Sequence, residues 1–269
     1  MMTTNASFLE EVDGFLIDLD GTIFKGDSLI PGADQAVAYI KSNQKQLVFV
    51  SNRGNYSRRM CCDKLKKLGI AAVEDEIILS STVTARFLKK HYPASRVWPF
   101  GDPGLQEELE THGISIATVP EEADFLVITL HETLTYHDLN CAFQAVRAGA
   151  RILATNTDKM FPAKSGLSID VAGMIGAIEA STGRKTEMTF GKPSTFMAEA
   201  ALERLEQLPE RCLMIGDSVE SDIFMGQMHS MKTMLVLSGN TKKEQLDIVL
   251  TRSKPNYIVE SIHDLIQLN

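Results

Sequence analysis

The sequence predicts an α/β fold in which helices alternate with the strands of a parallel sheet. Three short apolar runs, at residues 15–17, 46–50 and 212–215, are rich in branched or aromatic side chains, and each ends abruptly in polar residues. Such runs are typical of strands that are buried on both faces. Helix-like stretches at 31–42 and 57–68 follow the first two runs. Alternation of this kind indicates βα units and therefore a parallel sheet.

The same pattern continues through the rest of the chain. Ser57 is expected to cap the second helix, and Gly69 is expected to end it. Further helices are predicted at 83–92, 136–149, 171–182 and 195–207, apolar or amphipathic segments at 96–100, 105–112 and 125–130, and strands at 152–154, 188–190, 234–237 and 257–259.

Length and charge limit the classes of function. The chain has 269 residues, which suits two modest domains better than one large domain. Its net charge of −8 argues against nucleic acid or an anionic membrane as a partner, since both need a basic face. No apolar run approaches the roughly 20 residues of a membrane span, so we expect a cytoplasmic protein. The four cysteines lack C-x-x-C spacing and are expected to be buried or inert thiols: Cys61, Cys62, Cys141 and Cys212.

Two acids close the first strand, in the pentad Asp18-Leu19-Asp20-Gly21-Thr22. Open α/β sheets place their ligand chemistry just beyond the carboxyl ends of such strands. Two carboxylates that converge there repel unless a proton or a cation lies between them, and Mg²⁺ is a suitable hard cation. The alternative is structural: Asp20-Gly21 forms an ordinary turn and Asp18 caps a helix.

Polar residues also close three later strands. Ser51-Asn52-Arg53-Gly54 offers hydroxyl, amide and backbone donors that suit phosphoryl oxygens. Lys192, in Gly191-Lys192-Pro193-Ser194, stands where a strand gives way to a helix and could clamp a phosphate. Asp217 and Asp222 follow the strand at 212–215, although Asp217 or Ser218 could equally cap the next helix.

Four motifs in this order, each after a predicted strand, resemble those of the haloacid dehalogenase-like phosphohydrolases. The resemblance implies a Rossmann-like parallel-sheet core, residues 1–80 and 183–269, with an inserted α/β cap at 81–182 that determines specificity. It also implies the residue roles of a Mg²⁺-dependent phosphatase. Asp18 would be the nucleophile and Asp20 the general acid and base; a dehalogenase would lack that second acid. The other implied roles are metal binding by Asp18, Asp20 and Asp217, support of the metal site by Asp222, and phosphate binding by Ser51, Asn52 and Lys192.

An insert of roughly 100 residues between the second and third motifs resembles the large-cap subgroup. Nucleotide, pyridoxal phosphate and phosphoglycolate phosphatases belong to that subgroup. The segments 51–55, 131–136 and 169–174 are similar to the sugar-phosphate phosphatases of bacterial arabinose operons, which implies broad specificity for small sugar phosphates. Arg53 replaces an Asn that is common in the wider family, and Phe161 stands where pyridoxal phosphate phosphatases often carry His. Both departures weigh against pyridoxal phosphate.

The leaving group is expected to meet Arg53 together with the loop 156–161, in particular Asn156, Asp158 and Phe161. The structural alternative is that Asn156 and Asp158 only form a turn and that Lys159 is a solvated charge. The expected partner is a small phosphorylated metabolite. Whether the protein forms a homodimer is left open by the sequence. A phosphomutase is the rival among enzymes, and a non-catalytic phosphometabolite sensor is the rival from another class.

Overall fold

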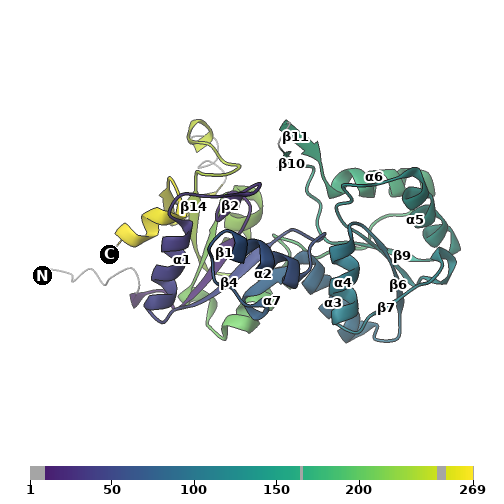
Figure 1. The fold of residues 1–269 in the computed structure, drawn as a ribbon, viewed down its shortest axis with the longest axis horizontal. Helices are drawn as coiled ribbons and strands as arrows, with labels where there is room; N and C mark the ends of the chain where they lie inside the picture. Colours follow the sequence, from purple (N-terminus) through teal and green to yellow (C-terminus); the bar gives the residue numbers. More distant parts are fainter. Residues whose placement is uncertain (1–9, 164–165, 247–252, 269) are drawn as a thin grey trace, which may run out of the picture. The chain divides into compact units, whose positions relative to one another are not determined.

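A computed structural model of the chain describes residues 10–163, 166–246 and 253–268 (Figure 1). The chain divides into two compact units. The first unit comprises Met1–Val50, Cys62–Ile78 and Ala198–Asn269, and the second comprises Ser51–Cys61 and Leu79–Met197. The boundaries expected for a core and a cap, at residues 81 and 182, stay predictions. No helix among the described residues is long and apolar enough to cross a membrane.

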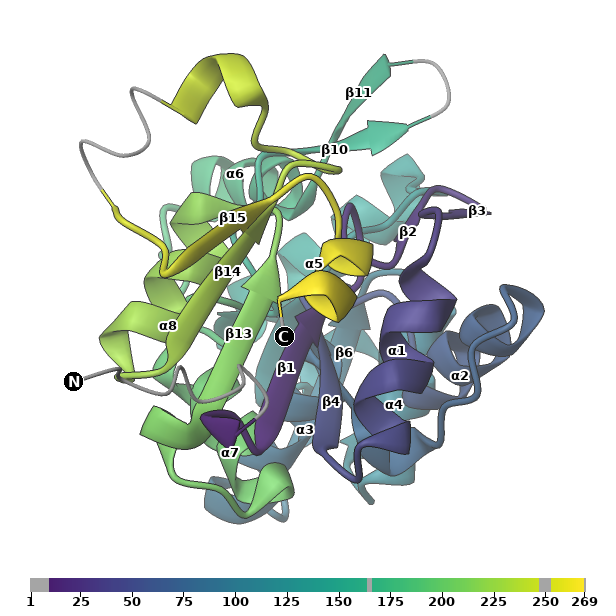
Figure 2. The ribbon, with the colours of Figure 1, turned by 90° about the vertical axis from the view of Figure 1, so that its left-hand side faces the viewer.

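A six-stranded sheet organises the first unit, in the order β15-β14-β13-β1-β4-β5. Figure 2 shows β1, β13 and β14 side by side, and the pairs β1–β13, β1–β4, β13–β14 and β14–β15 are parallel. Every residue of β1 and β13 is buried, as their apolar sequences predict. The strands are β1 (Gly14–Asp18), β4 (Gln46–Ser51), β5 (Ile77–Leu79), β13 (Cys212–Gly216), β14 (Lys232–Val236) and β15 (Tyr257–Val259).

Helices and short turns complete the first unit. Helix α1 (Ala33–Ser42) buries Ala33, Ala36, Val37 and Ile40, whose spacing places them on one helical face. The other helices are α2 (Arg58–Lys67), α7 (Thr195–Leu205) and α8 (Phe224–Met228). Both α2 and α7 begin in the second unit and end in the first. A hairpin of β2 (Phe24–Lys25) and β3 (Ser28–Leu29) follows β1, and short 3-10 turns occupy Glu74–Glu76, Pro209–Arg211, Lys243–Gln245 and Ile262–Gln267.

Asp13 joins the amino ends of three neighbouring strands. Its carboxylate accepts hydrogen bonds from Nε of Arg211 at 2.7 Å and from Nζ of Lys45 at 2.9 Å. These residues immediately precede β13 and β4, respectively. The hydrogen bond from Arg211, followed by that from Lys45, lowers the pKa of Asp13 to about 2. This ionic contact therefore helps to hold β1 between its two neighbours.

The second unit is built on its own parallel sheet, in the order β12-β9-β8-β6-β7. Its hydrophobic core includes Phe100, Leu126, Ile128, Val146 and Ile178. The strands are β6 (Arg96–Phe100), β7 (Ser115–Ile116), β8 (Phe125–Ile128), β9 (Arg151–Ala154) and β12 (Met188–Thr189), and the helices are α3 (Ser80–His91), α4 (Pro103–Thr111), α5 (Tyr136–Ala148) and α6 (Val171–Thr182). A 3-10 turn occupies Pro120–Glu122, and β10 (Met160–Ala163) and β11 (Gly166–Ile169) form an antiparallel hairpin.

The predicted α/β fold with parallel strands is confirmed. Ser57 caps α2 as expected, because its Oγ accepts a hydrogen bond from the backbone N–H of Met60 at 3.1 Å. Cys61, Cys62 and Cys212 are buried and Cys141 is half-buried. Burial raises the pKa of Cys212 to about 12, which agrees with the expectation of an unreactive thiol.

Candidate active site

Asp18 is the last residue of β1, and its side chain is buried. Its Oδ2 accepts a hydrogen bond from Oγ1 of Thr22 at 3.2 Å, and Thr22 is itself fully buried. The strand therefore delivers a carboxylate to the carboxyl edge of the sheet, where the sequence predicted a site. Thr22, the last residue of the pentad, orients this carboxylate and received no role in the sequence analysis.

Asp20 and Gly21 form the turn that follows Asp18. Gly21 has a φ of 89°, which non-glycine residues rarely adopt, and its backbone N–H donates to the carbonyl of Phe24 at 2.8 Å. Asp20 forms a backbone bridge with Phe24, and its side chain is half-buried. The turn interpretation of Asp20-Gly21 is thus correct, and the turn leaves the carboxylate of Asp20 partly accessible.

Asp217 and Asp222 gather with Asp18 into a buried carboxylate cluster. Within the described part of the chain, ligand oxygens of these three acids all lie within 4.8 Å of one another. The cluster forms because β13 is the parallel neighbour of β1, so their carboxyl ends meet at one edge. Three buried carboxylates at this separation repel one another unless a cation or protons compensate them. Hard oxygen donors of this kind fit Mg²⁺.

Asp217 is held by a loop that the sequence analysis did not include in the site. Its Oδ2 accepts a hydrogen bond from the backbone N–H of Asn240 at 2.6 Å, and its carbonyl accepts one from the N–H of Thr241 at 3.1 Å. A β-carbon on Gly239 would lie 1.7 Å from the same Oδ2, so only glycine fits there. The signal in the sequence is the Gly239-Asn240 turn directly after β14.

The side chain of Asp222 is held by the backbone of the turn that follows β13. Its Oδ2 accepts a hydrogen bond from the backbone N–H of Ser218 at 3.0 Å, and a β-carbon on Gly216 would lie 2.2 Å from that oxygen. Ser218 Oγ accepts from the N–H of Ser221 at 3.3 Å, which makes Ser218 the cap of the π-helical turn Val219–Ile223. The capping alternative for Ser218 is therefore correct, and it coexists with the acid cluster.

Ser51 and Arg53 lie at the start of the second unit. Ser51 is buried at the end of β4, and its Oγ accepts a hydrogen bond from the backbone N–H of Arg53 at 3.2 Å. The guanidinium of Arg53 lies over the ring of Tyr56, with Cζ 4.9 Å from the ring centroid. Arg53 is half-buried. The stacking therefore fixes the position of its guanidinium, and the residue stays partly accessible to solvent.

Lys192 and Asn52 are joined through backbone and side-chain hydrogen bonds. The backbone N–H of Lys192 donates to Oδ1 of Asn52 at 2.7 Å, and Nδ2 of Asn52 donates to the carbonyl of Lys192 at 3.2 Å. The same Nδ2 donates to Oδ2 of Asp158 at 3.0 Å. Lys192 is only 6% exposed, and a contact of its side chain with phosphate stays a prediction.

The loop after β9 contains the residues predicted to meet the leaving group. Asn156 is buried, and its Oδ1 accepts a hydrogen bond from the backbone N–H of Asp158 at 2.9 Å, so the turn predicted as the structural alternative does form. Lys159 is exposed, as that alternative expects. Phe161, on β10, packs against the hydrophobic core of the second unit. A contact of these residues with a leaving group stays a prediction.

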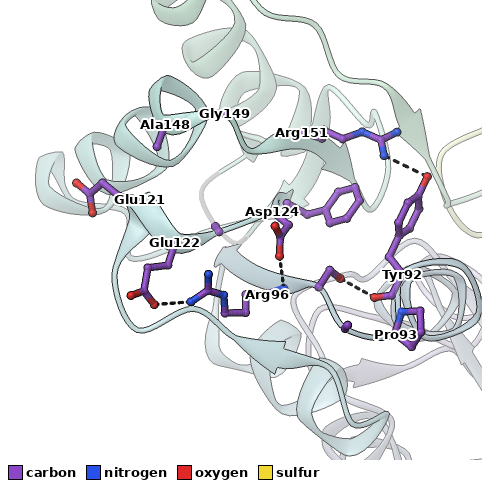
Figure 3. A pocket seen from close by; sticks show the side chains of 13 residues that line it. Tyr92, Pro93, Arg96, Glu121, Glu122, Asp124, Ala148, Gly149 and Arg151 are labelled. Atoms are coloured by element: carbon purple, nitrogen blue, oxygen red, sulfur yellow. Dashed lines mark hydrogen bonds and ion pairs between the residues drawn. The ribbon is translucent and has the colours of Figure 1, made fainter.

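A separate pocket of about 700 Å³ opens at the amino ends of β6, β8 and β9 (Figure 3). Its two arginines are engaged in ion pairs: Arg96 with Glu122 at 2.9 Å and Arg151 with Glu187 at 2.6 Å. The hydrogen bond to Glu187 is the main cause that raises the pKa of Arg151. None of the predicted site residues lines this pocket, which lies at the opposite edge of the sheet from Asn156.

Comparisons with known proteins agree with the motifs. The sequence model of the haloacid dehalogenase-like hydrolases matches residues 15–115, and a second model, described as HAD-hydrolase-like, matches residues 189–265. The sugar-phosphatase AraL of Bacillus subtilis is 52% identical over 95% of this chain and 92% of its own length. Phosphoglycolate phosphatase 2 of Arabidopsis thaliana is 32% identical over 97% of this chain and 95% of its own. The structure of a p-nitrophenyl phosphatase from Archaeoglobus fulgidus superimposes with a TM-score of 0.89 at 33% identity, covering 96% of this chain and all of the other.

Proposed function

Because this chain belongs to the haloacid dehalogenase-like hydrolases, we propose that it is a Mg²⁺-dependent phosphatase that releases phosphate from small sugar phosphates with broad specificity. The observation that carries the proposal is the buried cluster of Asp18, Asp217 and Asp222. A cluster of this kind at the carboxyl edge of a parallel sheet suits phosphoryl transfer, in which catalysis consists mainly of positioning and charge stabilisation.

In the proposed reaction, a carboxylate oxygen of Asp18 attacks phosphorus while the bond from phosphorus to the ester oxygen breaks. Asp20 gives its proton to the departing oxygen, and the sugar leaves with its hydroxyl restored. Asp20 then takes a proton from water, which attacks the phosphorus of the aspartyl phosphate and releases inorganic phosphate. Asp18 is regenerated, and Asp20 again carries a proton.

Further residues of the sequence motifs are proposed to hold and neutralise the transferred group. Mg²⁺ would be bound by Asp18, the backbone carbonyl of Asp20 and Asp217, and when bound it would supply positive charge to the phosphoryl oxygens. Asp222, tied to the backbone of Ser218, would keep the cluster in place. Ser51 and Lys192 of the second unit would bind the phosphoryl oxygens, and the buried ammonium of Lys192 would contribute most to charge stabilisation.

Sugar phosphates are the proposed substrate class because the sugar-phosphatase AraL is similar to this chain over nearly its whole length. A sugar offers many hydroxyls and little apolar area. Each hydrogen bond to such a leaving group contributes roughly 0.5–1.5 kcal/mol, which favours broad rather than exclusive specificity. Arg53, stacked on Tyr56, is the proposed contact from the second unit.

The test is a panel of phosphorylated sugars, nucleotides, phosphoglycolate and pyridoxal phosphate, assayed for release of inorganic phosphate with and without added Mg²⁺. We expect release from several sugar phosphates, with kcat/KM values within about two orders of magnitude of one another, and loss of release when EDTA removes the metal. Release from a nucleotide or phosphoglycolate alone would contradict the substrate class. If no phosphate were released from any compound, the alternative of a non-catalytic phosphometabolite sensor would be favoured. Transfer of the phosphoryl group to a second sugar, without free phosphate, would favour a phosphomutase.

A further inference from the structure

Asn52 links three loops of the second unit that follow three different strands. It stands after β4, its side chain contacts Asp158 in the loop after β9, and it also contacts the backbone of Lys192 in the loop after β12. Asp158 and Lys192 are separated from Asn52 by 106 and 140 positions in the chain. One amide group therefore connects the loop expected to meet the leaving group with the residue expected to bind phosphate.

The surroundings of Asn52 hold its backbone as firmly as its side chain. Its carbonyl accepts hydrogen bonds from Nδ2 of Asn156 at 2.7 Å and from Oγ of Ser80 at 2.8 Å. A β-carbon on Gly191 would lie 2.6 Å from Oδ1 of Asn52 and 2.8 Å from Cβ of Asn156. Glycine at position 191 thus lets the loop that carries Lys192 approach Asn52 closely.

The amide of Asn52 has a full set of protein partners. A side-chain amide offers two N–H donors and one carbonyl acceptor. Nδ2 has two acceptors within hydrogen-bond distance, the carboxylate of Asp158 and the carbonyl of Lys192, and Oδ1 accepts from the N–H of Lys192. A direct hydrogen bond from this amide to a phosphoryl oxygen would have to break one of these contacts. The geometry favours an indirect role.

We propose that Asn52 is a positioning residue that, together with Asp158, sets the place of Lys192, and that its amide does not itself bind the phosphoryl group. The proposal rests on the proposed function, in which Lys192 stabilises transferred charge. It changes the role of Asp158 as well, since the carboxylate orients the Asn52 amide and does not contact the leaving group. Substitutions at either position should then affect all substrates alike, because every substrate presents the same phosphoryl group.

The test is a double-mutant cycle with Asn52→Asp, Asp158→Asn and the double variant. In Asn52→Asp two carboxylates face each other where the amide now donates, so one of them should take up a proton with a raised pKa. We expect kcat to fall on the order of 10- to 100-fold near neutral pH, because a charge-stabilising group is misplaced. The value of kcat should recover as the pH is lowered, because protonation of one carboxylate removes the repulsion. The substrate ranking should stay that of the wild type. In the double variant the amide introduced at position 158 can donate to one oxygen of the carboxylate introduced at position 52, while the other oxygen still faces the carbonyl of Lys192. Part of the lost kcat should therefore return, and the pH-dependent loss should disappear.

Asn55→Asp is the matched control. Asn55 is buried in the same unit, and its Nδ2 donates to Oδ2 of Asp102 at 3.0 Å, so the substitution creates the same repulsion away from Lys192. It should lower the melting temperature without the pH-dependent loss of kcat. A double variant no more active than Asn52→Asp, or an altered substrate ranking, would overturn the proposal.

The melting temperatures of the same variants separate this proposal from the proposed function. If the wild type releases no phosphate, the proposed function fails, but coupling between positions 52 and 158 still appears as non-additive changes in melting temperature. Additive changes would overturn the contact between Asn52 and Asp158 whatever the activity.

Discussion

A β-carbon added to Gly21 would lie 2.1 Å from Oδ2 of Asp217, and only 2.9 Å from the α-carbon of Gly239. Gly21 belongs to the turn after β1, whereas Asp217 follows β13 and Gly239 follows β14. The acid cluster thus depends on a place where the side chain of Asp217 packs against two glycines, Gly21 and Gly239, that have no room for a β-carbon. The glycine of the first motif is required by this packing as well as by its positive φ.

Gly21→Ala is therefore expected to displace Asp217 and to raise the Mg²⁺ concentration needed for half-maximal activity on the order of tenfold or more, as changes around metal ligands do. Gly26→Ala is the control. Gly26 also has a positive φ, of 60°, but an added β-carbon there would meet no atom within 4 Å. The two variants share backbone strain and differ in the clash. Equal Mg²⁺ requirements in both would show that the contact with Asp217 does not matter.

Asp20→Asn tests the proton transfer. We expect kcat to fall by roughly 10² to 10⁴ for alkyl esters such as sugar phosphates, whose leaving oxygen needs a proton. The loss should be smaller for 4-nitrophenyl phosphate, because nitrophenolate leaves without one. The ratio of the two losses, measured at saturating substrate, is the result that matters. Equal losses would remove Asp20 from the general-acid role.

Lys192→Ala should lower kcat on the order of 10² or more, because the substitution removes a buried positive charge expected to stabilise the transition state. The backbone of Lys192 is held by Asn52, so the loop itself should keep its place. Lys185→Ala serves as the control, since the Lys185 side chain is 82% exposed and pairs with Glu179. A Lys192→Ala enzyme with the kcat of the control would exclude a role in charge stabilisation.

The ion pairs of Asp13 predict a pH dependence of stability. The folded pKa of about 2 lies below the ordinary value near 4, so the stabilisation is complete above about pH 4 and is lost as the pH falls toward 2. Asp13→Asn should therefore lower the melting temperature at pH 7, and the difference from the wild type should shrink below pH 4. Thermal unfolding of both proteins between pH 2 and pH 7 measures this difference in melting temperature. Glu260→Gln, at a pair with both side chains about 70% exposed, should change little at any pH.

The sequence predicted the long elements because their patterns extend over enough residues to be distinctive. Strands β1, β4 and β13 and helices α1, α5, α6 and α7 lie at or within a few residues of their expected positions. It did not predict β7, the β2–β3 hairpin or the β10–β11 hairpin, whose strands have two to four residues and too few positions to show a period. The sequence also did not predict the order of the strands in the two sheets, because strand pairing depends on contacts between distant segments of the chain.

The acids of the candidate site were singled out by their position after buried parallel strands, together with the family resemblance. In the structure Asp18, Asp217 and Asp222 lie in one cluster, and their part in the chemistry stays a prediction. The strand-end rule does not show what holds these acids, because the hydrogen bonds from Oγ1 of Thr22 and from the backbone N–H of Asn240 form only in the folded chain. The Gly239-Asn240 turn is visible in the sequence, but its contact with Asp217 is not. The contact of Asn52 with Asp158 spans 106 positions and needs the folded chain to be seen.

The most direct test of the central claim is release of phosphate by Asp18→Asn, with Asp34→Asn as the matched control. Asp34 lies in the first turn of α1 in the same unit and has no proposed part in the chemistry. Both variants should give the circular dichroism spectrum of the wild type. With a sugar phosphate and Mg²⁺ in excess, we expect no turnover above background from Asp18→Asn and near wild-type turnover from Asp34→Asn. Wild-type release by Asp18→Asn would contradict the assignment of Asp18 as the nucleophile.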